Sequence, residues 1–232
     1  MQLLEVNSFG VRSAIVRLQH PQTPMRFMLF PMLHLGSADF YREVATRLRG
    51  CQLVVAEGIR GRSTAASALT RAYRLLRHSR RLGLVVQELD LNGLGVPVVR
   101  PDMSAAEFGR RWRQFAVVPR LLDWWLVPLF AAGMALFGSR RFLARALGSL
   151  DDLPIREEPV HESFEALDRL ILDERDRLLL DALAFIHEQR CHEPIAVAVV
   201  YGAEHLRAVV HDLSARFGYR PVGADWLDVF EF

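Results

Sequence analysis

The chain of 232 residues contains no lysine, and its 29 basic side chains are all arginine, set against 27 aspartates and glutamates. Recognition of nucleic acid requires basic side chains gathered on one face among aromatic rings. The best candidate is the stretch 71–81, but its arginines recur mostly every three residues, as on the solvated face of an amphipathic helix. We therefore predict no nucleic-acid partner.

Cysteines, a signal peptide and long apolar runs are also scarce or missing. Cys51 and Cys191 are the only cysteines, whereas small disulfide-stabilised scaffolds use more. The first ten residues show no basic region followed by an apolar stretch, which a signal peptide would need. The uncharged run 124–138 is shorter than the roughly 20 residues of a membrane-spanning helix. We expect a cytoplasmic protein with reduced thiols.

Short apolar runs alternate with amphipathic stretches along the chain. Continuously apolar strands that alternate with helices indicate an α/β fold: a mainly parallel central sheet flanked by helices. We predict a single domain over 1–232 with a helical insertion at about 104–150. The expected strands are 11–18, 25–33, 52–58, 96–102, 195–202 and 226–232, and the other expected helices are 37–50, 63–83, 164–190 and 203–218.

Local signals mark the ends of two expected helices. Ser37 begins the stretch 37–50 and is a good N-cap, since its hydroxyl can accept a hydrogen bond from a free backbone N–H of the first turn. Gly50 and Gly218 follow amphipathic stretches and are suited to ending helices. These signals place both helices directly after apolar strands.

Polar residues follow four of the expected strands: His34, Glu57, Asp102 and His205. The carboxyl ends of parallel strands form one edge of a sheet, where ligands bind in open α/β folds. Two imidazoles and a carboxylate are typical ligands of a divalent metal. We predict His34, Glu57 and His205 as metal ligands, with Glu57 as either the third ligand or the general base.

Glu174 falls on the expected apolar stripe of the helix 164–190, together with Leu170, Ile171 and Leu178. A carboxylate buried there costs free energy unless it is paired. Two interpretations stay open: a partner at the strand ends, which would make Glu174 a catalytic residue, or an ordinary half-buried ion pair.

Residues 26–60 and 172–220 resemble the TraB/PrgY and Tiki family, which is related to the haem-binding ChaN and erythromycin-esterase-like proteins. The family has two GxxH motifs and a glutamate after a strand. The second motif is intact as Gly202-Ala203-Glu204-His205, and Glu57 matches the glutamate. At the first motif the chain has Pro31-Met32-Leu33-His34, with proline where glycine is expected, so that turn must differ. The region 104–150 has no clear counterpart.

The resemblance implies a metal-dependent hydrolase of peptide or ester bonds, with manganese, cobalt or zinc as the metal. It also extends to a Glu-Arg-Asn or Glu-Arg-Asp element on the helix before the last motif, matched here by Glu174-Arg175-Asp176. In this interpretation Glu57 orients or deprotonates the metal-bound water, and Arg175 either stabilises the oxyanion or holds Glu57.

Two other functions remain alternatives. In a haem or small-ligand carrier of the ChaN type, a histidine or a tyrosine such as Tyr201 would be the axial ligand. In a non-catalytic peptide-binding regulator, the apolar and arginine-rich segment 108–142 would contact a membrane surface or form a homodimer. A buried helical hairpin is the simpler interpretation of that segment.

Overall fold

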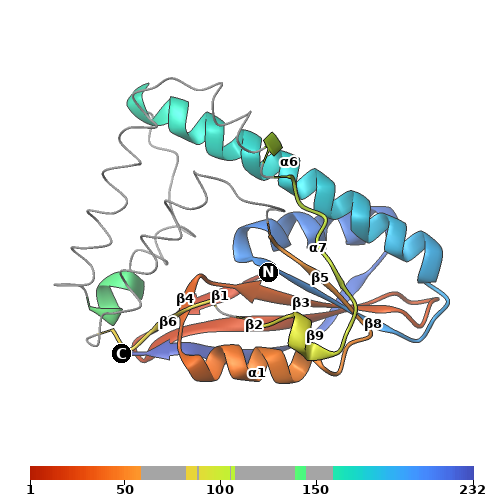
Figure 1. Ribbon diagram of the computed structural model, residues 1–232. Helices are drawn as coiled ribbons and strands as arrows, with labels where there is room; N and C mark the ends of the chain where they lie inside the picture. The colour runs from red at the N-terminus through yellow and green to blue at the C-terminus, as the bar shows by residue number, and fades with distance from the viewer. Residues whose placement is uncertain (59–81, 88, 105, 108–138, 145–158) are drawn as a thin grey trace.

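The computed structural model describes residues 1–58, 82–87, 89–104, 106–107, 139–144 and 159–232, with 159–171 described by their backbone alone (Figure 1). Residues 63–81 of the expected helix 63–83 and most of the predicted insertion at 104–150 lie outside these residues. The same holds for most of the segment 108–142, for which a membrane or dimer contact is predicted.

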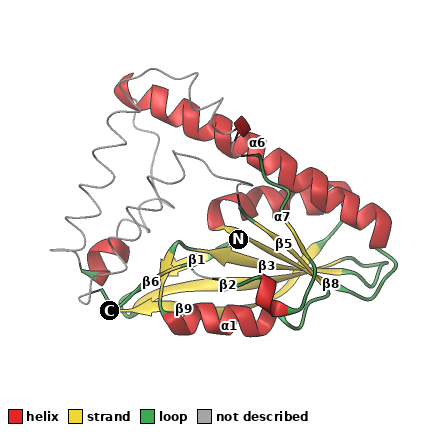
Figure 2. Ribbon diagram, viewed as in Figure 1, coloured by secondary structure: helices red, strands yellow, loops and turns green. Residues whose placement is uncertain are grey.

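A seven-stranded mixed sheet forms the centre of the fold (Figure 2). Four parallel neighbours lie in the order β3-β8-β5-β7, and β2 joins this group by pairing antiparallel with β3, β1 and β9. A separate small sheet pairs two short strands, β4 and β6. The bounds are β1 Leu4–Val6, β2 Gly10–Gln19, β3 Arg26–Met32, β4 Leu35–Gly36, β5 Leu53–Ala56, β6 Val85–Val86, β7 Val98–Val99, β8 Ala196–Gly202 and β9 Arg220–Glu231.

Helices cover both faces of the sheet. The long α6 (Pro159–Arg190) and α7 (Ala203–Phe217) lie on one side, and α1 (Ala38–Leu48) lies on the other (Figure 1). A short 3-10 turn, Asn92–Leu94, precedes β7. Ser37 caps α1 as expected, since its hydroxyl accepts the Phe40 N–H at 3.1 Å. Gly218 ends α7 with φ of 80°, a left-handed conformation that glycine adopts without strain.

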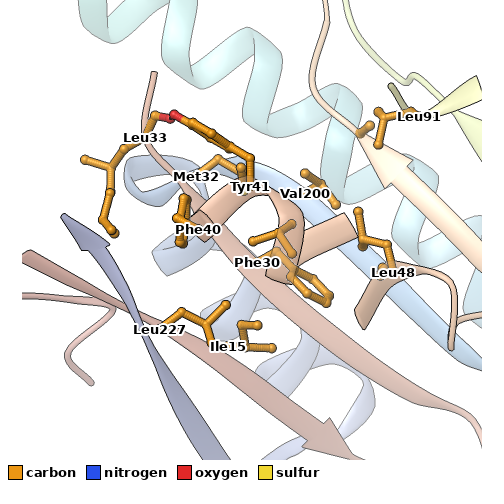
Figure 3. Close-up of a cluster of buried hydrophobic side chains, with 14 of the residues drawn as sticks. Ile15, Phe30, Met32, Leu33, Phe40, Tyr41, Leu48, Leu91, Val200 and Leu227 are labelled. Atoms are coloured by element: carbon orange, nitrogen blue, oxygen red, sulfur yellow. The ribbon is translucent and has the colours of Figure 1, made fainter. Parts of the chain in front are cut away.

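The alternation of side chains along β8 divides the core into two clusters. Ala198 and Val200 pack on the α1 side, in the cluster around Phe30 and Ile15 that Figure 3 shows. Val199 and Tyr201 pack on the other side, with apolar residues of α6 and α7. Because successive residues of a strand point to opposite faces, a fully buried strand must be apolar on both. This explains the unbroken apolar run that ends at the candidate site.

The predicted α/β class is confirmed: mostly parallel central strands flanked by helices. The closing strand begins earlier than expected, at Arg220, and pairs along the whole of β2. The strand β1 and the small sheet were not predicted, because two or three residues carry too little periodicity to be recognised. Within the described residues, no helix has both the length and the hydropathy needed to cross a bilayer.

Candidate functional site

The four strands that precede the predicted polar residues are neighbours in the sheet. His34 follows β3, Glu57 follows β5, and Asp102 lies three residues after β7. His205 lies in the first turn of α7, which begins directly after β8. Register pairs Met32 with Gly202 across β3 and β8, so these strands end level with each other. The predicted edge of the sheet is therefore present, and the side chains on it differ in what they contact.

Arg175 of α6 joins the ends of β5 and β7. Its Nη2 donates hydrogen bonds to Glu57 Oε1 at 2.6 Å and to Asp102 Oδ2 at 2.8 Å, and its Nε donates to Asp102 Oδ1 at 3.1 Å. The Asp102 side chain is fully buried, and that of Arg175 is 13% exposed. A buried carboxylate needs a partner of this kind, because its desolvation would otherwise be costly.

Backbone N–H groups complete the coordination of both carboxylates. Gly202 N–H donates to Glu57 Oε2 at 2.9 Å, while Gly58 N–H and Met103 N–H donate to the two oxygens of Asp102 at 3.1 and 2.8 Å. Burial alone would raise the pKa of Glu57 and of Asp102, but Arg175 and these donors outweigh it and hold both pKa values below their ordinary range. The two carboxylates are therefore ionised, and the same pairing raises the pKa of Arg175 against the opposing effect of burial.

His205 pairs with the residue next to Arg175. Its Nδ1 lies 2.6 Å from Asp176 Oδ1, and its side chain is fully buried. The other ring nitrogen, Nε2, is buried and has no hydrogen-bond partner among the residues that the structure describes. Glu204 Oε1 lies 3.9 Å from Nε2, which is too far for a hydrogen bond. The Glu204 side chain is 67% exposed. In the His205–Asp176 pair, Nδ1 is therefore held by a carboxylate and Nε2 remains available to another partner.

Gly202 leaves a small open face beside this histidine. A methyl group built there would lie 3.5 Å from Glu57 Oε2, 3.6 Å from Glu204 Oε1 and 3.6 Å from His205 Cδ2. Gly202 itself is half-buried. Two carboxylate oxygens and the imidazole edge therefore surround a space of about methyl size at the surface of the turn.

The structure separates the two predicted histidines by their exposure. His34 is exposed, whereas its neighbours Leu33 and Leu35 are buried. His34 lies in the bend between β3 and β4, where its side chain faces solvent while both leucines are buried in the core. Within the part of the chain that the structure describes, no three His, Cys, Asp or Glu side chains converge closely enough to hold a metal ion. The metal site formed by His34, Glu57 and His205 stays a prediction.

Glu174 forms an ion pair with Arg177, at 2.8 Å between Oε1 and Nη2. The buried stripe of α6 runs through Leu179 and Leu183, and Arg175 lies one turn before Leu179 on the same stripe. The expected stripe was therefore displaced by one residue, or about 100° around the helix. This displacement puts Arg175 and Asp176, rather than Glu174, at the strand ends.

Two residues of the site were not among the predicted catalytic or metal-binding residues. The sequence predicts that Asp102 lies at the strand ends but indicates no role for it. It indicates Asp176 only as the last residue of the Glu174-Arg175-Asp176 element. The signal for Asp102 was its position after a strand. The signal for Asp176 was weaker, since only the packing of α6 on α7 brings it to His205.

Comparison with models of known protein families, with curated proteins and with solved structures finds no match for this chain. Membership of the TraB/PrgY and Tiki family stays a prediction from the motifs, and the arrangement of the site carries the functional proposal.

Proposed function

We propose that this chain is a hydrolase of ester or peptide bonds in which His205 is the general base. One observation supports this proposal above the others. Asp176 holds Nδ1 of a buried imidazole, and Nε2 of the same ring has no hydrogen-bond partner within the described part of the chain. In His–carboxylate pairs of hydrolases, the carboxylate fixes the tautomer and orientation of the ring and leaves the second nitrogen to accept a proton.

The reaction would proceed through this spare nitrogen. Nε2 of His205 accepts a proton from a water molecule, and the water oxygen forms a bond to the substrate carbonyl carbon. Asp176 stabilises the imidazolium that results. When the tetrahedral intermediate collapses, the bond to the leaving oxygen or nitrogen breaks, and Nε2–H returns the proton to that atom. The imidazole ends the cycle in its starting state.

Glu57 and Arg175 support the site rather than transfer protons in this mechanism. Each oxygen of Glu57 already accepts a hydrogen bond, one from Arg175 and one from Gly202 N–H. Arg175 is occupied by two carboxylates. Of the two roles predicted for Arg175, the holding of Glu57 is the one these contacts support. Glu57 in turn fixes the backbone of the turn that carries His205.

A metal-dependent form of the same hydrolase is the second candidate. A carboxylate behind Nδ1 and a spare Nε2 are also how metal-ligating histidines are held. Such an ion would supply Lewis-acid activation of water, with His205, Glu57 and Glu204 as the nearby donors. Within the described residues, these side chains do not form a group of three donors that could hold the ion.

The two non-hydrolytic alternatives have less support. Tyr201, the candidate axial ligand of a haem carrier, is fully buried, and burial raises the pKa of its phenol, which disfavours the phenolate form. The peptide-binding alternative depends on the segment 108–142, which lies almost wholly outside the described residues.

Hydrolysis of 4-nitrophenyl acetate and of fluorescein-labelled casein by the purified chain tests the proposal. His205→Ala and Asp176→Asn should each lower kcat/KM for the hydrolysed substrate by about 10²–10⁴-fold. His211→Ala is the matched control, because His211 is an exposed histidine of the same helix and should leave the rate unchanged. Circular dichroism checks that each variant folds.

Metal dependence is decided in the same assay. Treatment with EDTA followed by addition of manganese, cobalt or zinc leaves the rate unchanged if His205 acts alone. Loss of the rate with EDTA and its return with one ion would favour the metal-dependent candidate. Equal rates for wild type and His205→Ala on both substrates would refute hydrolysis at this site, and a Soret band in the purified protein would favour the haem carrier.

A further inference from the structure

Among the residues described by the structure, the buried hydroxyl of Tyr201 has no hydrogen-bond partner, and it belongs to the residue just before the Gly202 turn. Buried tyrosines usually place their hydroxyl against an acceptor or donor. Phenylalanine would fill the same space without desolvating an O–H group. The unpaired hydroxyl therefore lowers the free energy of unfolding. Its position beside His205 indicates a functional role.

The Tyr201 ring lies edge-on to His205. The ring centroids are 5.7 Å apart and the planes meet at 85°. The side chain points to the α6 and α7 face of the sheet and is fully buried. Burial raises the pKa of the phenol, and the charges of Asp102 and Glu57 raise it further. Tyr201 therefore keeps its proton at neutral pH and acts as a hydrogen-bond donor.

Several other donors at this site already have acceptors. Arg175 donates to Glu57 and Asp102. The backbone N–H groups around the site, those of Gly58, Gly202 and Met103, donate to the same two carboxylates. Hydrolysis of a carbonyl compound develops negative charge on the carbonyl oxygen, and a donor aimed at that oxygen lowers the barrier.

We propose that Tyr201 is a catalytic residue, the donor that stabilises this oxyanion. The proposal rests on the hydrolase function inferred above. As the water oxygen bonds to the carbonyl carbon, the π electrons of the C=O bond move to the carbonyl oxygen, and the Tyr201 O–H donates a hydrogen bond to it. The phenol keeps its proton throughout, since the proton of the water goes to His205 and then to the leaving group.

Substrate would approach over Gly202. His205 Nε2 and the Tyr201 hydroxyl are both enclosed, so a ligand must open the site to reach them. The half-buried face of Gly202 lies against the edge of the His205 ring. Glu204 borders the same face with a side chain that is 67% exposed, and its Oε1 lies 3.9 Å from His205 Nε2. Rotation of this exposed side chain into solvent would be the movement that opens a path to Nε2.

Tyr201→Phe tests the proposal against Tyr219→Phe. Tyr219 is a fully buried tyrosine of the same core cluster, and its hydroxyl lies 3.0 Å from His187 Nδ1. Removal of the spare Tyr201 hydroxyl should leave the unfolding temperature unchanged or higher and lower kcat by about 10²–10³-fold, with little change in KM. Removal of the bonded Tyr219 hydroxyl should lower the unfolding temperature and leave kcat unchanged. The substrate is whichever of 4-nitrophenyl acetate and labelled casein the wild type hydrolyses.

The outcomes separate this proposal from the hydrolase function. If wild type is active, His205→Ala is inactive and Tyr201→Phe retains full kcat, the hydrolase stands and the role of Tyr201 is wrong. A lowered unfolding temperature with normal kcat in Tyr201→Phe would assign the hydroxyl a structural partner and also overturn the role. If wild type is no faster than His205→Ala, the hydrolase function fails and the oxyanion role falls with it.

Discussion

Arg175 and Asp176 are consecutive residues of α6, yet they bind opposite parts of the site. The Arg175 guanidinium lies 2.6 Å from Glu57 after β5, and the Asp176 carboxylate lies 2.6 Å from His205 on α7. Successive residues of a helix point about 100° apart, so one turn of α6 can reach both the sheet and the neighbouring helix. A single helical turn thus fixes the ion network and orients the proposed base.

Gly202→Ala should fold normally and lose activity. The φ of Gly202 is −50°, which alanine adopts freely, and the new methyl group would meet its neighbours at ordinary contact distances of 3.5–3.6 Å. We expect the free energy of unfolding to change by no more than about 1 kcal/mol. The methyl group would fill the proposed path to His205, so kcat/KM should fall at least tenfold in the 4-nitrophenyl acetate or casein assay.

Gly218→Ala is the control for that variant and should behave in the opposite way. Gly218 has φ of 80°, where alanine is strained by about 1–2 kcal/mol. Urea unfolding should detect this loss, while the folded protein keeps its rate. A normal rate in Gly202→Ala would show that substrate does not approach over this face.

Arg175→Leu should strongly destabilise the protein. It would leave the buried carboxylate of Asp102 without its charged partner, a loss expected to cost about 3–5 kcal/mol of unfolding free energy. Arg177→Leu on the same helix is the control. Its pair with Glu174 is exposed to solvent and screened, so its removal should leave the unfolding free energy almost unchanged. Similar losses in both variants would contradict a special role of the Arg175 network.

Asp102→Asn should change how stability depends on acid. The folded pKa values of Glu57 and Asp102 lie below their ordinary values of 4.5 and 3.8. Stability from a carboxylate with a depressed pKa is complete above the unfolded pKa and is lost as pH falls through the folded pKa. The stability advantage of wild type over Asp102→Asn should therefore be constant near neutral pH and shrink below about pH 4. Urea unfolding across this range measures it, and a constant difference down to low pH would contradict the pairing.

His187 should add a second, milder dependence near neutral pH. Burial lowers its pKa below 6.5, and the positive charge of His20 lowers it further, with His192 adding to the effect and Glu188 opposing it. A lowered histidine pKa means that stability is complete above the unfolded pKa and is lost as pH falls through the folded value. His187→Gln should therefore lose less stability than wild type between about pH 7 and pH 5. Equal slopes would show that His187 is not desolvated in solution.

Local signals explain why much of the fold could be predicted. The cap at Ser37, the stop at Gly218 and the apolar run of β8 act within a few residues of the structure they specify. They were enough to place Glu57, Asp102 and His205 after neighbouring parallel strands. The order β3-β8-β5-β7 then brought those strand ends together.

The pairings within the site could not be predicted in the same way, because they depend on contacts distant in sequence. Asp176 and His205 are separated by 29 positions, and Arg175 and Asp102 by 73. A displacement of one residue in the expected stripe of α6 was sufficient to place Glu174 on it instead of Arg175. The exposure of His34 goes with the burial of Leu33 and Leu35 on either side of it. The strand β4 has only two residues, so the sequence shows no alternating pattern from which this burial could be predicted.

The adjacency of Arg175 and Asp176 also bears on how the site forms during folding. A folding intermediate with an intact sheet but an undocked α6 would lack both the Arg175 network and the Asp176–His205 pair, since one peptide bond joins the two anchors. Any recovery of activity should therefore follow the docking of α6, in a single kinetic phase. Until α6 docks, the carboxylates of Asp102 and Glu57 lack the guanidinium that they share, and docking of the helix supplies it.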